Sequence, residues 1–263
     1  MPSRSDSRHY SVRACIVEVR LWRISFLILN LNSQFIIIMI GIIVAMRKEL
    51  DLLLPLLQQV NETSVGGFTF FQGLIGNNQV VAMQCGIGKV NAAMGALTMV
   101  NHFEPQCVIN TGVAGGADKL VRVMDIVVAS QVAYHDVWCG PESPLGRVQG
   151  LPLYYDAAPS LLMLVPNQDD IHVGLICSGD QFIDAIDKVN DIKASFPQAL
   201  AVDMESAAIA QVCYVRQAPF MSMRVISDSP GASHDNTQQY NDFWQDAPQH
   251  TFSVLQQMLQ QLG

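Results

Sequence analysis

Short apolar runs rich in β-branched residues recur along this chain and alternate with amphipathic stretches. Such continuous apolar runs are typical of strands that are covered on both faces. They lie at residues 35–44, 107–111, 125–132, 172–178 and 220–227. Strands that alternate with helices predict a single α/β domain with a mixed, mainly parallel central sheet flanked by helices.

Two helices are predicted from apolar residues that share one helical face. The first opens at Arg47 and carries leucines at positions 50, 53, 54 and 57, and the second covers residues 240–262 at the end of the chain. A hairpin is predicted at Gly76-Asn77-Asn78, between the strand-like residues 68–73 and 79–85. This hairpin makes the sheet mixed.

Glycine is concentrated at two further places. Residues 112–116 follow the run 107–111 and predict a binding loop whose backbone N–H groups can face a ligand. Residues 86–90, Gly-Ile-Gly-Lys-Val, lack the hydroxyl residue that follows the lysine of a Walker loop. They predict a glycine turn that lets the backbone approach a ligand or, equally well, a neighbouring strand.

Residues 1–38 differ from the rest because they are basic, whereas the remainder is acidic. Their apolar stretches are shorter than the roughly 20 residues that span a bilayer. We expect residues 1–38 to be an N-terminal extension without chemistry, for instance from a misassigned start, and residues 39–263 to be the functional domain. A location in the cytoplasm is expected, with no membrane partner.

Composition narrows the classes of function. Half of the 263 residues are hydrophobic, which supplies a large core, and a net charge of −8 provides no basic surface for nucleic acid. The six cysteines form no C-x-x-C pair, which favours free thiols in a reducing compartment. No metal site is predicted, because histidines and cysteines never cluster at ligand spacing.

Carboxylates stand at three predicted strand ends: Glu49, the pair Asp203 and Glu205, and Asp228. The pair could simply cap the helix that follows it, since carboxylates favour that end. If the strand ends meet, however, the acids suit cleavage of a glycosidic bond. One protonates the leaving group, another activates water, and a third holds sugar hydroxyls. Isolated residues such as His135 and Arg224 could join the site but are more often structural.

Six motifs in one order resemble a known family. They are Gly41-Ile42-Ile43 with Ala45-Met46 and Glu49, Gly86-Ile87-Gly88-Lys89-Val90, Asn110-Thr111-Gly112-Val113-Ala114-Gly115-Gly116, Ser178-Gly179-Asp180-Gln181-Phe182-Ile183, Val202-Asp203-Met204-Glu205 and Arg224-Val225-Ile226-Ser227-Asp228. Together they resemble the 5′-methylthioadenosine/S-adenosylhomocysteine nucleosidases of the nucleoside phosphorylase superfamily. The resemblance runs from about Met39 to the C-terminal helix. It implies a nucleoside phosphorylase-like fold and hydrolysis of both nucleosides to adenine, without a cofactor, in methionine and S-adenosylmethionine salvage.

The resemblance also implies a role for individual residues. Glu49 matches the base that activates water, and Asp228 matches the acid at adenine N7, which Ser227 orients. Glu205 matches the carboxylate that grips the ribose hydroxyls. The other substrate-binding residues that it implies are Met204 and Arg224 beside Glu205, Phe182 and Ile183 around adenine, Phe243 on the ribose side, and Met46, Ile87, Val113, Ala114 and Gly115.

Two positions depart from the family pattern. Val113 stands where the family often has serine, and Asp203 stands where it often has glutamate, although neighbouring backbone or a shorter carboxylate can serve. A homodimer is also implied, in which residues 137–152, from Val137 to Pro152, lie near the partner's site. This segment matches the family only loosely, which leaves the preferred 5′ substituent open.

Three other functions fit the same residues. A purine nucleoside phosphorylase would need cations around phosphate, and Lys89 is the candidate. A futalosine-type nucleoside hydrolase would use the same acids on another nucleoside. A nucleoside-binding sensor without catalysis would not need both an acid and a base.

Overall fold

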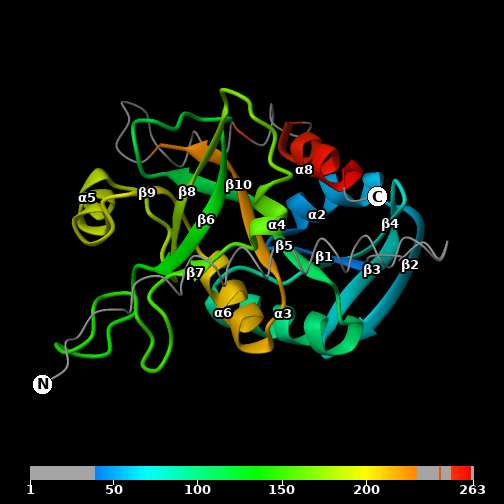
Figure 1. The fold of residues 1–263 in the computed structure, drawn as a ribbon, viewed down its shortest axis with the longest axis horizontal. Helices are drawn as coiled ribbons and strands as arrows, with labels where there is room; N and C mark the ends of the chain where they lie inside the picture. Colours follow the sequence, from blue (N-terminus) through cyan, green and yellow to red (C-terminus); the bar gives the residue numbers. More distant parts are fainter. Residues whose placement is uncertain (1–38, 230–242, 244–249, 262–263) are drawn as a thin grey trace, which may run out of the picture. The chain divides into compact units, whose positions relative to one another are not determined.

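The computed structural model describes residues 39–229, 243 and 250–261, so the expected extension at residues 1–38 lies outside the described residues. In this part of the chain, ten strands form one hydrogen-bonded sheet (Figure 1). The strands are β1 (Met39–Val44), β2 (Gln58–Val65), β3 (Phe68–Ile75), β4 (Asn78–Gln84), β5 (Cys107–Gly116), β6 (Ile126–Tyr134), β7 (Tyr155–Asp156), β8 (Ile171–Ser178), β9 (Ala199–Asp203) and β10 (Phe220–Asp228).

Five of these strands pair in a closed ring. The order is β5–β10–β6–β8–β9, and β9 pairs back to β5 at Gly115 and Gly116. From β5 the sheet continues through β1 to β4 by parallel pairs, and then to β3 and β2 by antiparallel pairs. The predicted mixed sheet and the hairpin at Gly76 are therefore confirmed. The ring, together with the pairing of β1 with β5, brings the ends of β1, β5, β9 and β10 towards one region.

Helices cover both faces of the sheet. They are α2 (Arg47–Leu53), the 3-10 helix η2 (Leu54–Leu56), α3 (Lys89–Phe103), α4 (Pro159–Leu162), α5 (Ile186–Ser195), α6 (Ser206–Arg216) and α8 (His250–Gln260). Figure 1 shows α3 beside α6. Buried residues of α2 and α8 belong to a second hydrophobic cluster. Within β1, Ile43 packs with α3 and α6, whereas Ile42 and Val44 pack with α2 and α8. This alternation places the two helix pairs on opposite faces of β1.

Three details of the predicted elements are wrong. The helix that opens at Arg47 ends at Leu53, because Pro55 lacks an N–H group and the chain continues as η2. Strand β2 was not predicted at all, because it is an exposed strand at the edge of the sheet without an apolar face. Residues 112–116 are not a loop but the second half of β5, which pairs with β10 and β9.

The predicted C-terminal helix is observed over His250–Gln260, where Phe252, Leu255, Met258 and Leu259 are buried. The rest of the expected range, apart from Phe243 and residue 261, lies outside the described residues. Among the helices that the structure describes, none has the length and hydropathy needed to cross a membrane.

Candidate active site

Glu49 lies in the first turn of α2, directly after β1, and is almost fully buried. Its Oε2 accepts the backbone N–H groups of Ala45 and Met46, each at 2.8 Å, and its Oε1 accepts the N–H group of Val113 at 3.1 Å. Burial raises the pKa of the Glu49 carboxyl, although Arg224 and these three donors act in the opposite direction. A carboxylate accepts about four hydrogen bonds, so Glu49 keeps one acceptor position, on Oε1.

Glu205 approaches the same region from the junction between β9 and α6. Its Oε1 accepts the backbone N–H group of Gly88 at 2.9 Å, and its Oε2 lies 3.6 Å from Arg224 Nη2. Burial raises the pKa of Glu205 to about 7, and the positive charge of Arg224 counters part of that effect. Most of its acceptor positions are still available to a ligand that carries hydroxyl groups.

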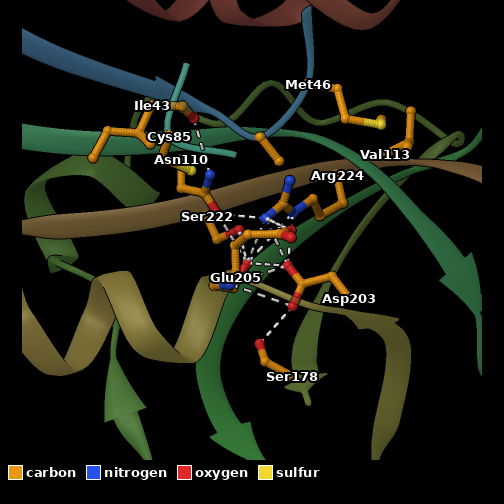
Figure 2. A network of polar contacts seen from close by, with 12 residues as sticks. Ile43, Met46, Cys85, Asn110, Val113, Ser178, Asp203, Glu205, Ser222 and Arg224 are labelled. Atoms are coloured by element: carbon orange, nitrogen blue, oxygen red, sulfur yellow. Dashed lines mark hydrogen bonds and ion pairs between the residues drawn. The ribbon is translucent and has the colours of Figure 1, made fainter. Parts of the chain in front are cut away.

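Arg224 is a fully buried cation at the centre of this polar network (Figure 2). Its Nε and Nη2 lie 2.8 and 2.7 Å from Asp203 Oδ2, and its Nη2 also donates to Asn110 Oδ1 at 2.5 Å. A buried ion pair of this kind is costly to break, because removal of one partner leaves an uncompensated charge. Arg224 and Asp203 therefore hold each other in place, and Asp203 is a counter-ion rather than a ligand-facing group.

Arg224 Nη1 has no hydrogen-bond partner among the described residues. A Cβ atom on Gly112 would collide both with this nitrogen and with the Glu49 carboxylate. Because these groups flank the same glycine, Arg224 Nη1 and Glu49 Oε1 lie near each other beside β5. They form a donor and an acceptor that a small polar group could bridge.

The network beneath the carboxylates contains four polar residues that were not predicted as site residues. Ser178 donates to Asp203, and the Ser206 hydroxyl contacts Asp203, Asn110 and the hydroxyl of Ser222. Asn110 in turn donates to the carbonyl oxygen of Ile43 in β1. These side chains come from different elements, so only the fold brings them together. The signal in the sequence was that polar side chains occupy positions inside otherwise apolar segments.

Asp228 ends β10, four residues beyond Arg224, which corresponds to about 13 Å along a strand. Its carboxyl is buried and accepts a hydrogen bond from the Ser227 hydroxyl at 2.7 Å. The same hydroxyl lies 3.3 Å from the carbonyl oxygen of Ala114. Burial raises the pKa of Asp228, and the bond from Ser227 only partly offsets this. Asp228 and Arg224, which lies beside Glu49 and Glu205, are thus separated along β10.

The other expected site residues range from buried to exposed. Phe182 and Ile87 are the most exposed, at 46% and 51%. Ile183, Ala114 and Phe243 are buried, and Met46, Val113, Met204 and Gly115 are half-buried. His135 is buried against Gly179, where burial lowers its pKa, and no hydrogen bond joins its ring to the four carboxylates. In the described ranges, no group of three or more His, Cys, Asp or Glu residues could hold a metal ion.

The sheet topology and the acids at its strand ends define an α/β protein of the nucleoside phosphorylase class, and a sequence profile described as "Phosphorylase superfamily" matches residues 39–260. A 5′-methylthioadenosine/S-adenosylhomocysteine nucleosidase from Exiguobacterium sp. is 43% identical over 199 residues, which cover 72% of this chain and 84% of that protein. This chain therefore belongs to the 5′-methylthioadenosine/S-adenosylhomocysteine nucleosidase family.

Solved structures agree with this assignment. The nucleosidase of this name from S. pneumoniae, bound to the transition-state inhibitor MT-ImmA, superimposes with a TM-score of 0.81 at 35% identity, over 86% of this chain and all of that one. A futalosine hydrolase from Helicobacter pylori superimposes with a TM-score of 0.79 at 30% identity, over 86% of this chain and 98% of that one.

Proposed function

We propose that this chain hydrolyses the N-ribosidic bond of 5′-methylthioadenosine and S-adenosylhomocysteine, and releases adenine and the 5-thioribose product. The observation that carries the proposal is a set of three buried carboxyls with raised pKa, namely Glu49, Glu205 and Asp228. An acid, a base and a sugar-binding carboxylate are what cleavage of a glycosidic bond needs. The reaction belongs to methionine and S-adenosylmethionine salvage.

In the proposed mechanism, Asp228 is protonated before the reaction and transfers its proton to N7 of adenine. The electrons of the C1′–N9 bond then move into the purine, and the ribose carbon becomes cationic. Water held by Glu49 Oε1 and Arg224 Nη1 attacks this carbon and gives its proton to Glu49. Glu205 accepts hydrogen bonds from the ribose hydroxyls. The raised pKa of Asp228 supports this role, because burial keeps the acid protonated at a higher pH.

The remaining residues are proposed to shape the pocket around these groups. Phe182 stacks on adenine, the backbone of Ile183 contacts it, and Ser227 orients Asp228. The ribose and its 5′ substituent are bordered by Met46, Ile87, Val113, Ala114, Gly115, Met204 and Phe243.

Water rather than phosphate is the proposed nucleophile. A phosphorylase needs cations whose charge is available to the anion, but Lys89 Nζ lies 2.6 Å from Asp136 Oδ2, and the charge of Arg224 is balanced by Asp203, 2.7 Å away. The futalosine hydrolase neighbours support hydrolysis on this fold, and they make futalosine the second candidate substrate. A binding sensor would gain nothing from an acid and a base held apart at opposite ends of the site.

Adenine release in phosphate-free buffer tests this function. With 5′-methylthioadenosine or S-adenosylhomocysteine, we expect release at a rate that added phosphate leaves unchanged, measured by separation of the products. Strict dependence on phosphate would contradict hydrolysis. If the base were released from futalosine but from neither of the other two nucleosides, the chain would be a futalosine hydrolase. If no base were released from any of the three nucleosides, a binding sensor would be favoured.

We also propose a homodimer, in which residues 137–152 lie near the partner's site. Two features support the dimer. Val90, Met94 and Leu97 lie on one face of α3 and are 69%, 52% and 43% exposed, and an exposed apolar face of this kind is typical of an interface. Residues 137–152 form an irregular segment with turns, in which Trp138 is 66% exposed.

A cytoplasmic location is proposed as well. Five cysteines are free thiols, which is typical of a reducing compartment: Cys85, Cys107, Cys139, Cys177 and Cys213.

The dimer is tested by the molar mass of the purified protein in solution, measured by light scattering. We expect the wild type at twice the chain mass of 28.9 kDa, and Met94→Glu shifted towards one chain because a charge enters the apolar face. Met163→Glu is the matched control, since Met163 is 74% exposed and follows α4 rather than lying on α3. A wild type at the mass of one chain would contradict the proposal.

A further inference from the structure

A charged cluster next to the carboxylates joins three parts of the chain. Lys89 Nζ lies 2.6 Å from Asp136 Oδ2 and 3.9 Å from Asp180 Oδ2, and 5.4 Å from the centre of the Tyr134 ring. Lys89 begins α3, Asp136 follows β6, and Asp180 follows β8. The side chains of Lys89 and Asp136 are only 22% and 17% exposed, so this ion pair is better shielded from water than an ordinary surface pair.

Both aspartates of the cluster also accept hydrogen bonds from the backbone. Asp180 Oδ1 accepts the N–H group of Lys89 at 2.7 Å, and Asp136 Oδ2 accepts the N–H group of Asp180 at 2.8 Å. The N–H group of Lys89 is one of the donors that the first turn of a helix leaves without an intrahelical partner. Asp180 thus caps α3 from a distant loop, where its charge is favourable. The cluster therefore connects the backbone at the start of α3 and the backbone at Asp180, in addition to its contacts between side chains.

Each of these backbone segments leads directly into the site. Gly88, the residue before Lys89, donates its N–H group to Glu205 Oε1 at 2.9 Å. Gly88 has a φ of 94°, and a Cβ atom there would lie 3.1 Å from Asp180 Oδ1, so the turn fits closely against the cluster. Phe182 comes two residues after Asp180, in the loop that is proposed to hold adenine.

We infer that Lys89, Asp136 and Asp180 form a clamp that positions the ribose carboxylate and the adenine loop relative to each other. The clamp residues are positioning residues: they act through the Gly88 amide and through the loop of residues 179–183. The substrate named in this inference rests on the proposed function. The clamp predicts that loss of the Lys89 charge weakens binding more than it slows the chemical step, because the acid and the base lie on other elements.

Steady-state kinetics of Lys89→Met with 5′-methylthioadenosine test the clamp. We expect KM to rise by about tenfold or more while kcat changes by less than about threefold. Lys89→Arg is expected to recover most of the binding, because it keeps a positive charge beside Asp136. Lys193→Met is the matched control: Lys193 pairs with Asp118, and these side chains are 23% and 21% exposed. This control should leave KM unchanged.

Amide hydrogen exchange provides a readout that does not depend on turnover. In Lys89→Met we expect faster exchange in residues 86–89 and 179–183, because the N–H groups of Lys89 and Asp180 lose their fixed acceptors. Unchanged exchange in both segments would overturn the clamp, and so would the same rise in KM in Lys193→Met. If the wild type releases no adenine, the proposed function fails, and the exchange measurement alone still decides on the clamp.

Discussion

Asp228→Asn is expected to lower kcat by roughly 10²–10⁴-fold, the usual contribution of a general acid, while adenine still binds. The reason is that the amide has nearly the same shape as the protonated carboxyl and can still donate a hydrogen bond to N7. It cannot transfer a proton, so the purine remains a poor leaving group. The measurement is single-turnover release of adenine from 5′-methylthioadenosine, together with the Kd for adenine.

The pH dependence gives a second test of the same residue. Asp228 acts in its protonated form, so its contribution to the rate is present below its pKa and is lost as the pH rises through it. Because burial raises that pKa, the loss should occur above the usual range of an aspartate. In Asp228→Asn this limb of the pH profile should disappear.

Asp125→Asn is the matched control for Asp228→Asn. Asp125 is a partly buried aspartate whose carbonyl oxygen accepts the N–H group of Ile226 in β10, so it adjoins the same strand. This variant should keep the kcat of the wild type. A kcat of Asp228→Asn within tenfold of the wild type would remove Asp228 from the mechanism.

Most of the strands, and their alternation with helices, could be predicted because their apolar runs carry a strong local signal. The two-residue strand β7 is too short for such a signal. Strand β2 could not be predicted either, because Gln58–Val65 is mostly polar and exposed, and it is a strand only because β3 pairs with it. Residues 112–116 were wrongly predicted as a loop, for the opposite reason. Their glycines suggest a loop, yet β9 and β10 supply hydrogen bonds and extend β5 to Gly116. Pairing between distant segments decided both cases.

The acids of the site were visible in the sequence because carboxylates at the ends of buried strands need an explanation. Their organisation was not visible. Asp203 and Arg224 are 21 positions apart, and their contact depends on the way in which β9 and β10 approach in the closed ring. The same holds for Lys89 and Asp136, 47 positions apart. Lys89, the candidate phosphate ligand in the sequence, is therefore paired with the carboxylate of Asp136 in the folded chain.

Arg224 connects the stability of the fold to the chemistry of the site. Its charge is balanced by Asp203, and Glu205 and Glu49 also lie within its electrostatic reach. The cation lowers the cost of ionising both glutamates, whose pKa burial raises. Glu49 can therefore be ionised, as a base must be, within a site that still raises the pKa of Asp228 further along β10.

Glu49→Gln is expected to lower kcat by roughly 10²–10⁴-fold, because the amide cannot take the proton of the attacking water. The new side chain would also place its NH₂ group against either the Val113 N–H group or the N–H groups of Ala45 and Met46. At least one hydrogen bond of the present arrangement is then lost, which costs about 1 kcal/mol of stability. A small fall in Tm should accompany the large loss of turnover, while adenine binding remains.

Asp51→Asn separates the loss of the base from the general effects of a changed charge on α2. Asp51 lies on the same helix, is exposed, and pairs with Arg47, so its amide variant should keep both kcat and Tm.

The pH dependence of the rate tests whether Glu49 acts as a base. Glu49 acts when ionised, so the wild-type rate should fall as the pH drops through its raised pKa, and Glu49→Gln should lack this fall. If Glu49→Gln retained the wild-type kcat, water would be activated elsewhere, and Arg224 Nη1 would have no catalytic partner on α2.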